Sequence, residues 1–139
     1  MHKIRCSALG LLALFALLLT LQTSPAHAKS PAPKVVAAVF YADWCPLCKQ
    51  MGPSVMKTMQ GYAGDKSVKF VKFDLTNDAT KAQSAKLAAR NKLTPIWKAN
   101  QKTGMVLLVN GKTHKVLDTI VVTDSEADMK RKIEAAKSG

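Results

Sequence analysis

The sequence predicts an α/β protein in which helices flank a central sheet of mixed strand direction. A continuous apolar run at 35–41 is followed by a helical pattern and then by a second strand-like run at 68–75. A helix between two neighbouring strands implies a parallel crossover. Near the C-terminus, an Asn-Gly pair at 110–111 separates two further strand-like segments, which predicts an antiparallel hairpin.

Composition limits the chain to one globular domain. A length of 139 residues suits a single domain, and 47% hydrophobic with 22% charged residues excludes a disordered tail. Three cysteines are too few for a disulfide-dense scaffold, and no repeat of solenoid length is present. Lys and Arg total 21 against 9 Asp and Glu, for a net charge of +12. No nucleic-acid-binding motif accompanies this charge, so we expect no nucleic-acid partner.

The first 28 residues have the organisation of a cleavable export signal. A positive start containing Lys3 and Arg5 precedes an apolar run at 8–21, and Ala26-His27-Ala28 gives a small-x-small cleavage pattern. The run is shorter than the roughly 20 residues that span a bilayer, although an uncleaved N-terminal anchor is the alternative. Cleavage would leave 111 residues with a net charge of +10 and two cysteines, Cys45 and Cys48.

The mature chain begins with an extended segment and a buried strand. Segment 29–34 contains two prolines and is expected to be a stiff lead-in to a domain spanning 35–139. The run 35–41 is apolar and rich in β-branched residues, which is typical of a strand buried on both faces. A helix is expected to open at the cysteine pair, with apolar residues that are spaced by four and share one face: Leu47, Met51, Val55 and Met59.

The middle of the chain predicts a strand and two helices. A polar turn at 61–66 precedes the strand at 68–75, and 76–78 offers three helix N-caps before a helix at 79–91. A short helix is expected through Asn100, with Thr94 as its N-cap and Pro95 as its first residue. Trp97 in this helix is expected to join the core.

The C-terminal part predicts a hairpin and a last helix. Residues 105–109 form the first strand, and 112–117 return as its partner. Thr123 and Glu126 have the spacing of a capping box before a helix through Lys137. Its inner face is expected to hold three residues: Met129, Ile133 and Ala136.

The sequence Cys45-Pro46-Leu47-Cys48 is the candidate chemical site. The thiolate is the reactive form of cysteine, and the unpaired N–H groups and dipole of a helix N-terminus favour it. Cys45 is therefore expected to attack a disulfide, and Cys48, one turn inward, to resolve the mixed disulfide. Pro46 suits the first turn because it lacks an N–H there. This chemistry needs no cofactor and no metal.

A strand followed by Trp44-Cys45-x-x-Cys48-Lys49 resembles the thioredoxin superfamily. The segments 41–45 (Tyr-Ala-Asp-Trp-Cys) and 73–78 (Phe-Asp-Leu-Thr-Asn-Asp) look most like the periplasmic C-terminal domain of transmembrane disulfide reductases of the DsbD type. Pro53 falls where thioredoxins carry a proline in this helix. The resemblance implies a thioredoxin-like three-layer fold and an exported thiol-disulfide oxidoreductase. It further implies a reducing role toward disulfide-containing exported proteins, with a membrane thiol-disulfide reductase as a candidate electron donor. From the export signal we expect a periplasmic location, and we expect a monomer.

The chain departs from the family pattern at two places. Val39 stands where thioredoxins carry a buried acidic residue, so Lys72 on the next strand lacks its usual partner. Proton transfer would then use water or Asp74. The second departure concerns the loop that faces the cysteines, where the family carries a proline. Counting back from the hairpin favours Thr103, followed by Gly104, at this position. Pro95 is the alternative. The residue at this position is expected to form the substrate groove together with Trp44 and Leu47.

The cysteine pair has two alternative interpretations. A purely structural disulfide is one, but a bridge within Cys-x-x-Cys closes a very small loop and stabilises the fold little. The other is a periplasmic copper(I)-binding chaperone that uses the same two thiols, because soft sulfur ligands suit Cu(I) and three methionines follow the pair: Met51, Met56 and Met59. Methionines at helical spacing are commonly core residues.

Overall fold

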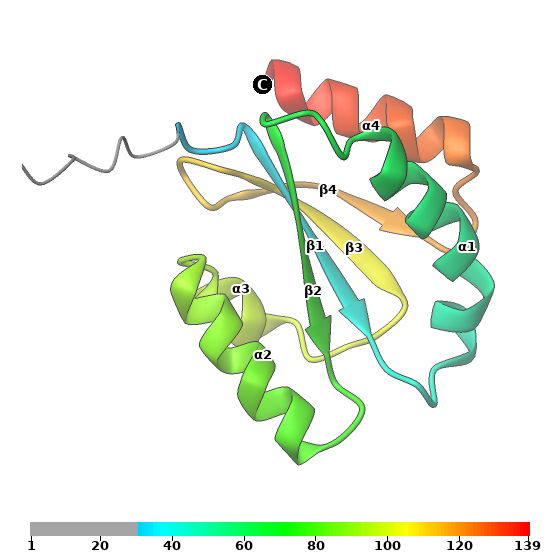
Figure 1. Cartoon of the computed structure of the whole chain (residues 1–139), viewed down its shortest axis with the longest axis vertical. Coiled ribbons are helices and arrows are strands. Elements are labelled where there is room, and N and C mark those ends of the chain that lie inside the picture. Colours follow the sequence, from blue (N-terminus) through cyan, green and yellow to red (C-terminus); the bar gives the residue numbers. More distant parts are fainter. Residues whose placement is uncertain (1–30) are drawn as a thin grey trace, which may run out of the picture. The chain divides into compact units, whose positions relative to one another are not determined.

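The computed structural model describes residues 31–139, which form one mixed sheet between two layers of helices (Figure 1). The strands lie in the order β2 (Val68–Asp74), β1 (Val35–Tyr41), β3 (Met105–Asn110) and β4 (Val116–Val121). β1 runs parallel to β2 and antiparallel to β3, and β3 runs antiparallel to β4. The predicted α/β fold with a mixed sheet is confirmed.

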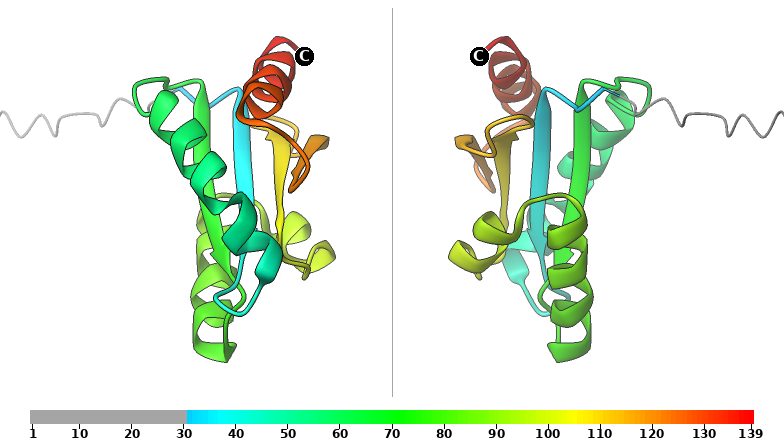
Figure 2. Two further views of the ribbon diagram at one scale, coloured as in Figure 1. Left: turned by 90° about the vertical axis from the view of Figure 1, so that its right-hand side faces the viewer. Right: turned by 90° about the vertical axis from the view of Figure 1, so that its left-hand side faces the viewer.

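The helices cover both faces of the sheet. α1 (Pro46–Gly61) and α4 (Glu126–Ser138) lie on one face, and α2 (Asp78–Arg90) and α3 (Thr94–Ala99) lie on the other (Figures 1 and 2). Within residues 31–139, none of the helices combines the length and the apolar character that crossing a bilayer requires.

The core consists of two apolar clusters, one on each side of β1. Successive side chains of a strand point to opposite faces, and Val35 to Ala38 of β1 are all buried, so this strand supplies both clusters. Under α2 and α3, Trp97 stacks on Phe40 with ring centroids 6.4 Å apart, which confirms that Trp97 is a core residue. Under α1 and α4, the predicted inner face of the last helix is buried as expected: Met129, Ile133 and Ala136.

The apolar face of α1 begins later than predicted. Met51 and Val55 are buried, but Leu47 is 45% exposed. Its side chain packs instead near Gly104, at the start of β3. Leu47 therefore belongs to the surface around the cysteines.

The predicted return strand of the hairpin is misplaced. The strand begins at Val116, not at residue 112, because residues 111–115 form a longer loop in which the Asn110 side chain accepts hydrogen bonds from the N–H groups of Lys112 and Thr113. Gly111 donates its N–H to the Lys34 carbonyl, and a Cβ there would lie 1.8 Å from the Pro33 carbonyl oxygen. The glycine thus serves a close contact with the lead-in segment and not a two-residue turn.

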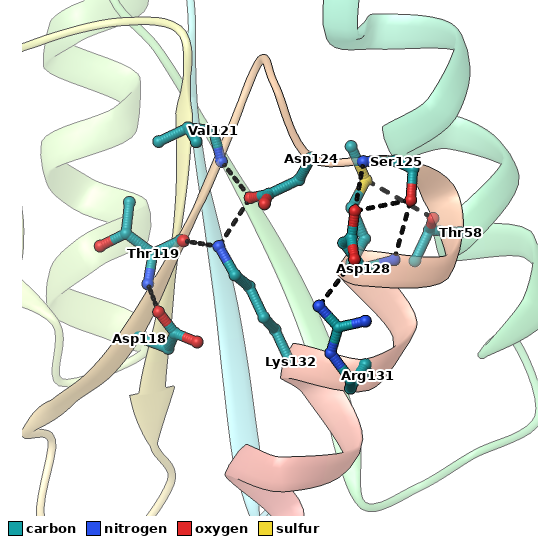
Figure 3. Close-up of polar contacts among 10 residues, drawn as sticks. Thr58, Asp118, Thr119, Val121, Asp124, Ser125, Asp128, Arg131 and Lys132 are labelled. Atoms are coloured by element: carbon teal, nitrogen blue, oxygen red, sulfur yellow. Dashed lines mark hydrogen bonds and ion pairs between the residues drawn. The ribbon is translucent and has the colours of Figure 1, made fainter.

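The N-terminal cap of α4 also differs from the prediction. Ser125, not Thr123, is the N-cap, and it exchanges hydrogen bonds with Asp128 (Figure 3). The helix begins later because Asp124 is held in the preceding turn, where its carboxylate accepts from the Val121 N–H and from Lys132.

The N-termini of α2 and α3 are stabilised in different ways. Asn77 caps α2 through a hydrogen bond from the Thr80 N–H, 3.0 Å long, as one of the three predicted caps. For α3, the predicted N-cap is wrong by one residue: Leu93 is the N-cap and Thr94 is the first helical residue. Leu93 is fully buried, so packing rather than a side-chain cap fixes this helix start.

Candidate active site: a thiol pair at a helix N-terminus

Cys45 is itself the N-cap of α1. The segment 42–44 leads from the end of β1 to this residue, whose backbone is extended and whose Sγ accepts a hydrogen bond from the Cys48 N–H at 3.2 Å. Pro46 is the first residue of the helix, where it removes no helical hydrogen bond. Both cysteines are free thiols, and both are buried.

The two thiols have opposite pKa shifts. Burial alone would raise the pKa of Cys45, but hydrogen bonds from the Cys48 thiol, the Thr103 side chain and nearby backbone N–H groups outweigh it and lower this pKa. For Cys48, burial raises the pKa, and the hydrogen bond of its thiol to Cys45 raises it further. Cys45 is therefore the thiol that loses its proton first.

The loop that carries Trp44 is fixed by Thr76. The Asp43 N–H donates to the Thr76 hydroxyl at 3.0 Å, and the Trp44 indole N–H donates to the Thr76 carbonyl at 3.1 Å. Trp44 is 62% exposed beside Cys45. Thr76 was not among the predicted site residues, although the carboxyl ends of the parallel strands β1 and β2 meet at one edge and could have indicated it.

The segment Thr103–Gly104 faces the cysteines. Gly104 donates its N–H to the Phe40 carbonyl at 3.0 Å. Its φ is +81°, and a Cβ at this position would lie 2.8 Å from Leu47 Cβ and 3.6 Å from Cys45 Sγ. Both the backbone conformation and the space therefore require glycine here.

Pro95 is not part of this arrangement. It lies exposed in the first turn of α3, a helix whose Trp97 packs in the core on the α2 side of the sheet. All peptide bonds of residues 31–139 are trans. Of the two candidates for the position opposite the thiols, the structure places Thr103 there.

A cavity of about 130 Å³ lies beside Cys48, between α1 and the sheet. Apolar side chains form most of its wall, among them Val39, Met51 and Met105. Lys72, which is the register partner of Val39 on β2, also lines it. Cys48 Sγ lies 3.8 Å from the Phe40 carbonyl oxygen. Val39 thus leaves open, apolar space next to the resolving cysteine.

The polar groups around this cavity are already engaged. The Tyr41 hydroxyl donates to Asp43 at 2.5 Å, and this hydrogen bond is the main cause that raises the pKa of Tyr41 to about 12. The Lys72 ammonium lies 3.7 Å from the centre of the Tyr41 ring, a cation–π contact. Tyr41 therefore stays protonated at neutral pH and does not accept a proton.

Asp74 holds the loop that follows β2. Its carboxylate accepts from the Thr76 N–H at 2.8 Å. Burial alone would raise the pKa of Asp74, but hydrogen bonds from Thr76 and the charge of Lys72 outweigh it and lower this pKa. Asp74 thereby stabilises the same Thr76 segment that positions Trp44.

A family model described as Thioredoxin matches residues 26–121. Among solved structures, the fold is similar to StoA from Bacillus subtilis, with a TM-score of 0.51 and 22% identity over 74% of this chain and 84% of that one. It is also similar to MTB dsbF, with a TM-score of 0.51 and 16% identity over 76% and 82%.

A thiol:disulfide interchange protein of Chlorobium tepidum gives a TM-score of 0.51 and 19% identity over 75% of this chain and 80% of its own. No curated protein matches the chain.

Proposed function

The chain belongs to the thioredoxin family, and from this we propose that it is an exported thiol-disulfide oxidoreductase that reduces disulfides of periplasmic proteins. The observation that carries the proposal is the position of Cys45. Its sulfur caps a helix, accepts the Cys48 N–H and has a lowered pKa. The exposed side chains of Trp44 and Leu47 stand beside it and offer an apolar surface to a protein substrate.

The first chemical step is attack by Cys45. Its thiolate forms a bond with one sulfur of the substrate disulfide, and the S–S bond of the substrate breaks. The other substrate sulfur leaves as a thiolate and takes a proton from water. The product is a mixed disulfide between Cys45 and the substrate.

The second step is resolution by Cys48. Its thiol loses a proton and attacks Cys45 Sγ, which releases the second substrate thiol and leaves a Cys45–Cys48 disulfide. Two electrons have then passed to the substrate. Because Val39 supplies no carboxylate and Asp74 is bonded to Thr76, we propose that water in the cavity beside Cys48 accepts this proton.

The reducing direction is supported by the resemblance of 41–45 and 73–78 to the periplasmic domain of DsbD-type reductases. A reductant must be reduced again by a dithiol donor, and we propose a membrane thiol-disulfide reductase in that role.

The segment before residue 29 is proposed to be removed on export, so that the mature chain begins at Lys29. Mass spectrometry of the exported protein tests this, and a chain that retains residues 1–28 would contradict cleavage.

The test of the activity is reduction of insulin disulfides by the purified mature protein with dithiothreitol as donor. Wild type is expected to accelerate reduction. Cys45→Ser should abolish it, because no attacking thiol remains, whereas Cys48→Ser should accumulate a mixed disulfide at Cys45. Equal activity of wild type and Cys45→Ser would overturn the proposal.

The reduction potential of the pair tests the direction separately. Equilibration with glutathione and counting of thiols gives this value. A potential near the roughly −270 mV of thioredoxin supports a reductant. A value near the roughly −120 mV of a strong oxidant would retain the enzyme class but overturn the reducing role.

A further inference from the structure

We propose that the reduced thiol pair, together with the methionines that flank it, forms a binding site for one Cu(I) ion. The ligands are the thiolates of Cys45 and Cys48 and the thioether sulfurs of Met51 and Met105. This site uses the two cysteines of the proposed enzyme but does not depend on disulfide exchange, since it exists only while both thiols are reduced and free.

The positions of the sulfur-bearing side chains carry the proposal. Cys48, Met51 and Met105 all line the cavity between α1 and the sheet. Met51 follows Cys48 by three residues on α1, so the two lie on the same face of the helix. Met105 is the register partner of Phe40, whose carbonyl oxygen lies 3.8 Å from Cys48 Sγ.

Cys45 lies next to Cys48 without lining the cavity itself. Its Sγ is hydrogen-bonded to the Cys48 N–H, and it lies next to Gly104, which immediately precedes Met105. One thiol and two thioethers, from α1 and from the first residue of β3, therefore line one cavity, and the second thiol adjoins it at the N-cap of α1.

The donor set selects a soft ion. Thiolate and thioether ligands favour Cu(I), whereas structural zinc requires four ligands of the Cys, His or carboxylate type. Within residues 31–139, no group of three or more His, Cys, Asp or Glu side chains comes together. The largely apolar wall of the cavity also has no carboxylate that would favour a hard cation.

The charge of the site favours the complex. Two thiolates and one Cu(I) ion have a net charge of −1, and binding releases the two thiol protons. The Lys72 side chain lines the same cavity and provides one positive charge. A lysine in the wall therefore compensates a bis-thiolate complex, whereas it would repel a cation held by thioethers alone.

The structure changes which methionines belong to this group. Met59, which follows the cysteines in sequence, packs in the core under α1 and α4 and does not line the cavity. Met105, which is distant in sequence, does. Met56 lines the cavity but is 56% exposed, so it connects the site with solvent and offers a path by which the ion enters.

The test measures the affinity of the reduced mature protein for Cu(I) under anaerobic conditions, by competition with the chromophoric chelator bathocuproine disulfonate. Wild type is expected to bind one Cu(I) per chain. The double variant Met51→Leu/Met105→Leu should bind at least tenfold more weakly, because leucine keeps the volume but removes both thioethers. Met59→Leu is the matched control and should bind like wild type.

A second measurement identifies the ligands directly. With methionine methyl groups labelled with ¹³C, Cu(I) should shift the signals of Met51 and Met105 and leave those of Met59 and Met129 in place. Wild-type affinity in the double variant, or a binding level below one Cu(I) per chain, would overturn the proposal. Insulin reduction by the metal-free Met59→Leu control should equal that of wild type. The comparison of wild type with Cys45→Ser tests the enzyme proposal without copper, so a failure of copper binding leaves that proposal intact.

Discussion

The reactivity of Cys45 depends on the hydrogen bonds that its sulfur accepts. Burial in apolar surroundings favours the protonated form of a thiol and raises its pKa. The pKa of Cys45 is nevertheless lowered, because its sulfur accepts hydrogen bonds from the Cys48 thiol, the Thr103 side chain and the helix N–H groups. Thr103 is the donor that comes from outside the helix, so its contribution can be removed without disturbing the helix start.

We expect Thr103→Val to raise the pKa of Cys45. Loss of one hydrogen bond, about 0.5–1.5 kcal/mol, should slow alkylation of this thiol by iodoacetamide at pH 7 by about two- to tenfold. The alkylation rate as a function of pH gives the midpoint directly. Thr113→Val, in the exposed loop between β3 and β4, should leave the profile unchanged; an equal shift in both variants would contradict a specific role of Thr103.

Gly104 is constrained both by its left-handed backbone conformation and by the lack of space for a Cβ. Gly104→Ala is expected to lower the free energy of unfolding by about 1–2 kcal/mol, the cost of a left-handed conformation for a residue with a side chain. Its Cβ would also displace Leu47, which should slow insulin reduction. Urea unfolding of this variant and of Gly64→Ala, where a Cβ has open space, separates the local strain from a general effect of alanine.

At the scale of elements, a partly buried ion pair joins α4 to the end of β4 (Figure 3). Lys132 Nζ lies 2.7 Å from the Asp124 carboxylate and donates to the Thr119 carbonyl at 2.8 Å. Asp124 also accepts the Val121 N–H. Lys132 thus donates hydrogen bonds to both a carboxylate and a backbone carbonyl near the connection between β4 and α4.

We expect Lys132→Met to lower the free energy of unfolding by about 1–3 kcal/mol, because it leaves these partners without their charged donor. Lys130→Met provides the control, since its ion pair with Glu126 is more exposed and should be worth no more than about 1 kcal/mol. Urea denaturation of both variants measures the difference, and equal losses would show that the pair does not fasten α4.

The elements that the sequence predicts well are those with a local cause. The β1 strand, the helix after Cys48 and the inner face of α4 follow from runs of side chains alone. The hairpin strand was misplaced because Gly111 serves a contact with Pro33, 78 residues earlier in the chain. Likewise, the cavity beside Cys48 depends on Met105, whose proximity to the cysteines arises only from strand register.

At the scale of the whole molecule, several carboxylates have pKa values below their usual range. Hydrogen bonds from Ser67 and Lys137 lower the pKa of Asp65 to about 2. Lys130 and Lys57 lower that of Glu126, and Ser125 lowers that of Asp128. Because these groups bind protons more weakly in the folded chain than in the unfolded one, they stabilise the fold above the unfolded pKa of about 4.

The stability of the protein should therefore be nearly constant from pH 7 to 5 and should fall as the pH decreases from about 4 to about 2. Urea midpoints at pH 7, 4 and 2.5 measure this. Asp65→Asn should be less stable than wild type at pH 7 and should lose less on acidification. A wild-type midpoint that is the same at pH 2.5 and pH 7 would contradict the role of these carboxylates.

The two ends of the described chain lie at the end of the sheet opposite the thiols (Figures 1 and 2). Lys34, Ser138 and Gly139 line one shallow hollow there, whereas Cys45 follows the far end of β1, seven residues or about 20 Å away. A resin, a fluorescent label or a fused protein joined at either end would thus leave the cysteines unobstructed. The molecule is suited to attachment in a defined orientation, with its reactive side facing the solution.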